Sequence, residues 1–174
     1  MTLTKKISYI FISFIVLIIL FYGWYKYTHS MEEAPSFEVN SSENLVSLLI
    51  ATQGSDFKNA VTNNIVNYFK DEAIFIKVID VSKLNNTEAK DFNSILLIHT
   101  WENTKPPAEI EKFINNNKEL RKKTVVYTTS GDGSYKMKNV DALTGESNLE
   151  DIDQVSKQII EKLKTILKTA KTEI

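Results

Sequence analysis

The sequence predicts an α/β protein, a three-layer sandwich around a mostly parallel sheet of four or five strands, preceded by one N-terminal transmembrane helix. An unbroken apolar run near the N-terminus predicts the membrane helix. Beyond it, apolar runs of strand length alternate with segments whose apolar residues recur at helical spacing. The strand runs are apolar at nearly every position, so both sheet faces are expected to be buried beneath helices that connect parallel strands.

The apolar run Ile7–Tyr25 is long enough to cross a bilayer as a helix. At about 1.5 Å per residue it spans roughly 28 Å, close to the hydrocarbon thickness of a membrane. A cleaved secretory signal is the alternative, but no small-residue cleavage site follows the run. Aromatic residues typical of a membrane interface surround its end instead, namely Tyr22, Trp24, Tyr25 and Tyr27.

Charges around this run predict its orientation. Lys5 and Lys6 precede it and Lys26 follows it, which favours a single-pass protein with a cytoplasmic N-terminus and an extracytoplasmic domain. The chain is expected to have four parts: a short basic N-terminus at 1–6, the transmembrane helix at 7–25, a stalk at 26–43 and a folded domain at 44–174. The stalk is polar and lacks periodicity, and the domain is long enough for one hydrophobic core.

Overall composition limits the partners and cofactors. The formal net charge is −1 and the basic residues are spread along the chain, so no basic surface of the kind that binds nucleic acid is expected. The chain has no cysteine and two histidines, so no metal site is expected. The membrane is the first predicted partner.

Each element of the domain follows from its pattern of apolar residues. Short apolar runs predict strands at 45–50, 73–79, 95–98 and 124–127, and an edge strand within 140–145. Helical spacing predicts helices at 57–69, at 106–114 with a Pro-Pro start, and at 152–167. Ligands of such sheets bind beyond the carboxyl ends of the strands. Function is therefore expected in three loops, which are Thr52–Phe57, His99–Lys105 and Thr128–Tyr135.

Those three loops resemble the loops of flavodoxins. Ala51–Lys58 (ATQGSDFK) stands where flavodoxins hold the phosphate of flavin mononucleotide (FMN) at a helix amino terminus. His99–Pro107 (HTWENTKPP) falls where the family places an aromatic ring against the isoalloxazine, and Thr129–Tyr135 (TSGDGSY) falls where a second aromatic closes the other side. The resemblance implies a flavodoxin-like sandwich that binds FMN noncovalently. It implies these cofactor-binding residues: Thr52, Gln53, Gly54, Ser55, Asp56, Thr100, Trp101, Ser130, Gly131, Asp132, Gly133 and Tyr135.

The chain departs from the flavodoxin pattern in ways that bear on flavin binding. Asp56 stands where the family offers a hydroxyl to the phosphate, and a carboxylate there repels a phosphate dianion. The structural interpretation is that Asp56, or Ser55 before it, caps a helix. The helices that the family carries within 82–91 and 131–137 are expected to be reduced or missing.

Structural roles compete with ligand roles at three other positions. Trp101 either covers the end of the core or faces a ligand. His99 is expected to be a satisfied strand-end residue, because no motif places a nucleophile or an acid beside it. Asp132, between two glycines, is expected to shape a turn, with a hydrogen bond to a ligand as the alternative.

Two functions are consistent with these observations. The first is a membrane-anchored FMN protein that passes electrons to a redox partner, with the cofactor supplying the chemistry. The second is a flavin-free flavodoxin-like scaffold that serves as a tethered module for binding or assembling proteins. No catalytic residue is assigned, because the sequence lacks the nucleophile-elbow, phosphate-loop and dinucleotide-binding motifs.

Overall fold

The computed structural model describes residues 3–29, 31–102 and 105–172, and the chain forms two compact units, Met1–Met31 and Glu32–Ile174. The first unit is helix α1 (Leu3–His29), whose segment Thr4–Trp24 is long and apolar enough to span a membrane. Several predicted features lie outside the description. They are residues 1–2 of the basic N-terminus, residues 103–104 of the second loop, and the side chains of Tyr25, Lys26 and Tyr27.

The second unit is built on a six-stranded sheet with the order β1-β3-β2-β4-β5-β6. Its strands are β1 (Phe37–Val39), β2 (Val46–Thr52), β3 (Ile74–Asp80), β4 (Ser94–Thr100), β5 (Thr124–Thr129) and β6 (Asp141–Gly145). All neighbours pair in parallel except β1, which runs antiparallel to β3. The mostly parallel sheet and the edge strand at 140–145 are confirmed. In chain order the parallel strands follow the pattern 2-1-3-4-5, which places a switch point between β2 and β4.

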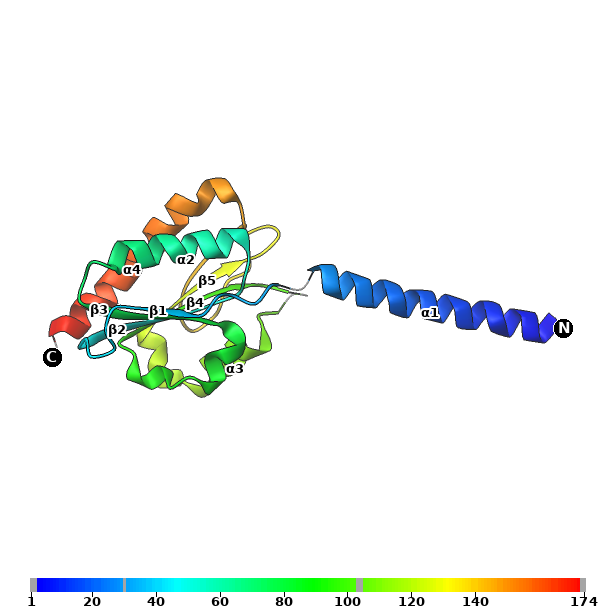
Figure 1. The fold of residues 1–174 in the computed structure, drawn as a ribbon, viewed down its shortest axis with the longest axis horizontal. Coiled ribbons are helices and arrows are strands. Elements are labelled where there is room, and N and C mark those ends of the chain that lie inside the picture. Colours follow the sequence, from blue (N-terminus) through cyan, green and yellow to red (C-terminus); the bar gives the residue numbers. More distant parts are fainter. Residues whose placement is uncertain (1–2, 30, 103–104, 173–174) are drawn as a thin grey trace. The chain divides into compact units, whose positions relative to one another are not determined.

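Helices cover both faces of this sheet, as Figure 1 shows. Helices α2 (Asp56–Phe69) and α4 (Ile152–Thr172) lie side by side on one face and share its apolar core. The other face is covered by helix α3 (Ala108–Asn116) and by short 3-10 segments, which are Val81–Asn86, Ala89–Asp91 and Lys118–Lys123. The three-layer arrangement predicted from the continuously apolar strands is therefore confirmed.

Local sequence explains where the two long helices sit. In α2, Phe57, Val61 and Ile65 recur every four residues and are buried, so one stripe of the helix faces the sheet. In α4, Ile159 and Leu163 are likewise buried, whereas the lysines of this helix are mostly exposed. The expected reduction of helix within 82–91 is confirmed, because that stretch forms two 3-10 segments.

The structure differs from the expected stalk at 26–43 at both ends, because residues 26–29 continue helix α1 and the rest is largely part of the folded unit. Residues 32–43 belong to the second compact unit, and Phe37–Val39 form an edge strand on β3. The side chains of Phe37 and Val39 pack against the core beneath α2 and α4. A strand of three residues in a polar stretch has no alternation of its own to reveal it, because its pairing depends on a partner distant in sequence.

Truncating the core side chain of Leu163, which is 0% exposed, is expected to destabilise the domain strongly. The Leu163→Ala change removes apolar contacts and leaves a cavity, so the free energy of unfolding should fall by about 3 kcal/mol. Urea denaturation of the full chain in detergent measures this loss. Lys157→Ala on the exposed face of the same helix should change it by less than about 0.5 kcal/mol. Equal losses in the two variants would contradict the proposed packing.

Candidate functional site

The candidate site lies at the carboxyl ends of β2, β4 and β5, where the sheet order reverses. The strands extend two residues beyond the apolar runs, so Thr52, Thr100 and Thr129 are the last residues of their strands. Thr100 is the register partner of Thr129, and the Trp101 N–H donates to the Thr129 carbonyl at 2.7 Å. The structure therefore brings together the three loops that the sequence selected.

The first loop leads into α2 and caps its amino terminus. Ser55 is the N-cap residue, and its hydroxyl accepts a hydrogen bond from the Lys58 N–H at 3.3 Å. Asp56 is the first helical residue and is exposed. Of the two caps proposed from sequence, Ser55 is the one observed, while Asp56 places its carboxylate in the first turn, where the helix dipole favours it.

The amide of Gly54 is already engaged by another part of the chain. Its N–H donates to the carbonyl of Glu32 at 2.8 Å. A Cβ at position 54 would lie 2.6 Å from that carbonyl oxygen, so this approach requires glycine. The group that would face a phosphate in a flavodoxin is thus occupied by backbone of the same chain.

Lys58 is a site residue that the sequence analysis missed. Its side chain is 1% exposed, and its Nζ donates to the Ser55 hydroxyl at 3.3 Å. Burial lowers the pKa of Lys58 to about 8, and the Glu102 carboxylate partly offsets this effect by favouring the charged form. Helical spacing could have predicted the burial of Lys58, because it lies three residues before Val61 and seven before Ile65 on the buried stripe.

Gln53 links the first loop to the second. Its side-chain carbonyl accepts the Thr100 N–H at 2.7 Å, and its Nε2 donates to Glu102 Oε1 at 3.3 Å. The hydroxyls of Thr100 and Thr129 lie 2.9 Å apart and share a hydrogen bond. Gln53 and Thr100, which the resemblance assigns to a cofactor, are in this structure bonded to each other and to Glu102 and Thr129.

The two aromatic residues assigned to the flavin ring stack directly on each other. The ring centroids of Trp101 and Tyr135 are 5.4 Å apart, with an interplanar angle of 9°. His99 stacks on Trp101, with a centroid separation of 6.4 Å. The Trp101 Nε1 is buried and has no hydrogen-bond partner among the described residues. Trp101 therefore covers the strand ends and also presents an unused donor.

His99 is satisfied by its neighbours, as expected from sequence. Its Nδ1 lies 3.3 Å from the Thr100 carbonyl and its Nε2 lies 3.2 Å from the Thr128 hydroxyl. Burial, with a smaller contribution from the Lys58 ammonium, lowers the pKa of His99 to about 4, although the hydrogen bond to the Thr100 carbonyl acts in the opposite direction. The imidazole is consequently neutral near pH 7. It then donates through Nδ1 and accepts at Nε2.

The third loop is a turn organised by Asp132, which confirms the structural interpretation of this residue. Its carboxylate accepts from the Ser134 N–H at 3.1 Å, from the Ser134 hydroxyl at 2.8 Å and from the Ser130 hydroxyl at 3.3 Å. The hydrogen bonds from Ser134 lower the pKa of Asp132. Gly133 has φ of +65°, a backbone conformation that favours glycine.

Strand β6 fixes the same loop from the side. The Thr144 hydroxyl lies 3.0 Å from the Gly133 carbonyl and 2.5 Å from the Tyr135 carbonyl. Gly131 has open space around its Cβ position. The two contacts of Thr144, to the carbonyls of Gly133 and Tyr135, hold the loop that places Tyr135 over Trp101. The Tyr135 side chain remains 41% exposed.

We call the region between the described residues of the three loops, Thr52–Phe57, His99–Lys105 and Thr128–Tyr135, the crevice, and its own side chains fill it. A planar ring needs about 3.5 Å to each neighbouring ring, so an isoalloxazine between Trp101 and Tyr135 requires their planes to be about 7 Å apart. The observed stack leaves no such gap. No group of three or more acidic or histidine side chains suited to a metal ion occurs among the described residues.

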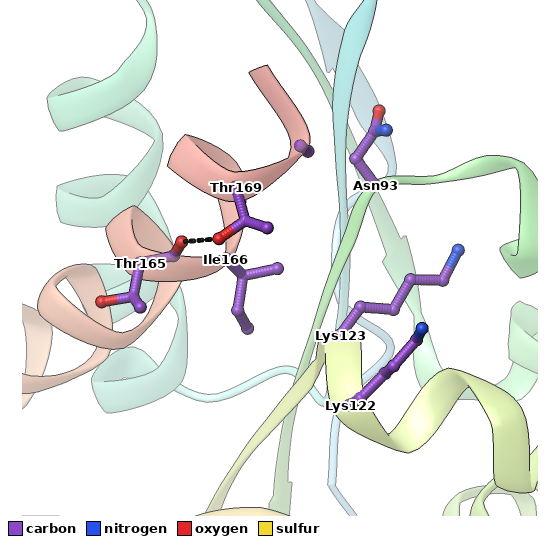
Figure 2. Close-up of a pocket in the computed structure, with 7 residues that line it drawn as sticks. Asn93, Lys122, Lys123, Thr165, Ile166 and Thr169 are labelled. Atoms are coloured by element: carbon purple, nitrogen blue, oxygen red, sulfur yellow. Dashed lines mark hydrogen bonds between the residues drawn. The ribbon is translucent and has the colours of Figure 1, made fainter. Parts of the chain in front are cut away.

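A separate cleft lies at the opposite end of the sheet. It has a volume of about 430 Å³ and is bounded by Asn93 before β4, by Lys122 and Lys123 before β5, and by the last turns of α4. Figure 2 shows the two lysines along one wall and Thr165, Ile166 and Thr169 along the other. The Lys123 Nζ donates to the carbonyls of Lys90 and Phe92, so this lysine has a structural role.

Comparison with known proteins supports the fold. No protein-family model matches the chain, and no curated protein matches its sequence. A solved structure of a flavodoxin from the domain Archaea superposes with a TM-score of 0.50 at 13% identity, covering 70% of this chain and 99% of that one. A second, described as a sugar-phosphate isomerase from Listeria monocytogenes, has a TM-score of 0.37 at 14% identity and covers 78% of each chain. The fold of this protein is flavodoxin-like.

The buried ammonium of Lys58 is expected to make stability pH-dependent. Because its folded-state pKa of about 8 lies below the usual 10.5, the unfolded chain binds more protons between these values. The cost of burying the charge is therefore full below pH 8 and disappears toward pH 10.5. Lys58→Met should be more stable than the unmodified protein at pH 7, by up to about 3 kcal/mol.

That advantage should shrink as the pH rises from 8 to 10.5. Urea denaturation of both proteins across this range measures it. Lys157→Met, which replaces an exposed lysine, serves as the matched control and should show no such trend. A constant difference between Lys58→Met and the unmodified protein would contradict a desolvated ammonium at this position.

Proposed function

We propose that this protein is a membrane-tethered, flavin-free binding module with a flavodoxin-like fold. The observation that carries the proposal is the direct stack of Trp101 on Tyr135, with centroids 5.4 Å apart. In this arrangement the two aromatic side chains occupy the place that the flavodoxin resemblance assigns to the isoalloxazine ring of FMN. The module would bind or assemble a protein partner at the membrane.

The phosphate end of the crevice supports the same proposal. The Gly54 N–H is bonded to the Glu32 carbonyl, and Lys58 is bonded to the Ser55 hydroxyl. Two carboxylates lie at the first loop, because Asp56 is in the first turn of α2 and Glu102 accepts a hydrogen bond from Gln53. Placing a dianion beside them costs Coulomb energy, which a single buried ammonium only partly offsets.

The membrane location rests on α1. Its segment Thr4–Trp24 has the length and composition of a membrane span, and Lys5 and Lys6 at its start favour a cytoplasmic N-terminus. We therefore place the flavodoxin-like unit outside the cytoplasm. Tethering raises the effective concentration of the module for partners at the same membrane.

One observation favours a second function, FMN binding with electron transfer to a redox partner. Trp101 and Tyr135 are almost parallel, and the Trp101 Nε1 has no partner among the described residues. Parallel rings on two loops at a switch point can receive a planar ligand if the loops separate. Thr52, Gln53, Gly54 and Ser55 would then hold the phosphate, with Thr100 and the Ser130–Gly133 loop at the ring.

Titration with FMN separates the two functions. The full chain in detergent is expected to show no saturable quenching of flavin fluorescence up to millimolar FMN, because the aromatic stack and the bonded Gly54 amide leave no site. Saturable binding in the micromolar range would instead support the flavoprotein. In that case Trp101→Ala should weaken binding, whereas Tyr68→Ala, which removes an exposed aromatic on α2, should not.

Membrane attachment is tested by fractionation. The full chain should stay in the membrane fraction after an alkaline carbonate wash, and removal of residues 1–31 should release the remainder, because an apolar span of this length partitions stably into the bilayer. A reporter fused after Ile174 should be active only outside the cytoplasm. Reporter activity in the cytoplasm would reverse the proposed orientation.

A further inference from the structure

We propose that the outer edge of β1 is a docking site for an extended segment of a partner protein. The segment places uncharged polar side chains on the α2 side of the strand and basic side chains on the other side. The inference rests on the proposed function, because it names the kind of partner that the binding module would take. Strand β1 lies outside the parallel part of the sheet, whose strand ends form the crevice.

Strand β1 leaves one edge of the sheet open. It is the last strand in the sheet order, and β3 is its single neighbour among the described strands. In an antiparallel pair, residues alternate between those that bond to the partner strand and those whose N–H and C=O point away from it. Along Phe37–Val39, the groups that point away from β3 therefore face no further described strand. An added strand can bond to such groups, and many domains recognise extended peptides in this way.

Hydrogen bonds to side chains hold β1 at both ends. Before the strand, the buried Ala34 donates its N–H to Asp80 Oδ2 at 2.8 Å. After the strand, Asn40 has φ of +68°, and its Nδ2 donates to the Ile74 carbonyl at 2.8 Å. The edge is thus extended before a partner binds, which lowers the entropy cost of docking.

A cleft of about 190 Å³ lies on the α2 side of this edge. Phe37 and Val78 line it from the sheet, and Asn59, Thr62 and Asn63 line it from the helix. Thr62 is 3% exposed, and its hydroxyl has no hydrogen-bond partner among the described residues. The described lining of the cleft holds no charged side chain. An uncharged partner side chain with a hydroxyl or amide group therefore suits it.

A second cleft, of about 450 Å³, lies on the opposite side of β1. Lys77 and Lys83 line it, and each forms an ion pair, Lys77 with Glu38 at 2.8 Å and Lys83 with Glu33 at 3.0 Å. Ile79 also lines this cleft and offers apolar surface to the stem of a long side chain.

The charge nearest to an added strand is the carboxylate of Glu38. Glu38 belongs to β1 itself, whereas its register partner Lys77 lies one strand farther in, on β3. Lys83 lies in the 3-10 segment after β3. Side chains directly opposite each other on neighbouring strands favour opposite charges. A lysine or arginine on the partner segment would therefore extend the alternation of charge that Lys77 and Glu38 begin.

The two clefts together match the geometry of an extended peptide. Successive side chains of a strand point to opposite faces, so a peptide beside β1 would direct alternate side chains toward the two clefts. Because one water occupies about 30 Å³, each cleft has room for a side chain. Main-chain hydrogen bonds would supply affinity, and the two clefts would supply specificity.

A second copy of this chain is a less favourable occupant of the edge. If two β1 strands paired antiparallel about Glu38, the two Glu38 carboxylates would lie opposite each other. Like charges in that position are destabilising. The edge therefore fits a segment of different sequence better than it fits itself.

The test uses a capped synthetic peptide of alternating threonine and lysine, TKTKTKT, and the full isotope-labelled chain in a nonionic detergent. NMR should show saturable shifts of the Phe37–Val39 amides. The same peptide N-methylated at its three central residues should give none, because it lacks main-chain donors there. An equal response to the N-methylated peptide, or no saturable shift up to millimolar peptide, would overturn docking by strand addition.

Reversal of one charge tests the preference for basic segments. The unmodified protein should bind TKTKTKT about fivefold more tightly than TETETET, and Glu38→Lys should reverse this order. Glu161→Lys is the matched control, because Glu161 is also exposed and paired with a lysine, Lys164, and it should keep the original order. Equal affinity of the unmodified protein for both peptides would overturn the charge assignment.

The variant Thr62→Val tests the cleft beside α2. The buried Thr62 hydroxyl has no described partner to lose, so the fold should be retained. Affinity for TKTKTKT should fall about fivefold, the effect of one lost hydrogen bond. Unchanged affinity would overturn the role of this cleft.

The readout at β1 separates this inference from the proposed function. Peptide shifts confined to the three loops would support a binding module but overturn β1 as its site. Shifts at β1 that grow with protein concentration in the absence of peptide would make a second copy the occupant and overturn the partner segment. Saturable FMN binding would overturn the flavin-free function, whereas the peptide comparisons would still decide whether the β1 edge docks a basic segment.

Discussion

Burial of the central strand β2 on all sides is the constraint on which the structure depends. Its backbone pairs with β3 on one side and β4 on the other, and Leu48, Leu49 and Ile50 are fully buried. Helices must therefore cover both faces of the sheet, and the chain must cross over to reach each parallel neighbour. The end of β2 then emerges at the switch point, so the placement of the crevice follows from the packing of the core.

The polar and aromatic groups of the crevice make their contacts with one another. Polar groups at the strand ends need partners once they are removed from water, and here Gln53, Thr100 and Thr129 bond to one another. The aromatic rings of Trp101 and Tyr135 gain contact area by stacking. A ligand would have to break these interactions before it forms its own. The free energy of breaking them would weaken its binding.

Sequence predicted the parts of the structure that local patterns determine. The apolar run at 95–98 specified β4, and the cap and apolar stripe at Ser55–Phe69 specified α2. The three loops were correctly located because the ends of parallel strands share one edge of the sheet. The strands continue past their apolar runs, since backbone pairing at Thr52 and Thr100 does not depend on side-chain polarity.

Other features depend on contacts between distant segments and could not be predicted. Strand β1 exists only because β3 offers it an edge. The stack of Trp101 on Tyr135 depends on how Asp132 and Thr144 shape the third loop. The buried stripe of α2 accounts for the burial of Lys58, but the influence of the Glu102 carboxylate on it depends on how the second loop meets the first. In each case the local sequence allowed several conformations and the tertiary partner selected one.

The antiparallel pairing of β1 also gives the domain a mechanical weak point. Tension applied from the N-terminal side of the chain reaches Glu32 first, then Ala34, and only then the pairs that Phe37 and Val39 form with β3. Each of these contacts contributes roughly 1 kcal/mol, far less than the cooperative core behind them. Under such a load these few contacts would break before the pairs of the parallel sheet, so the N-terminal edge would separate while the core stays intact.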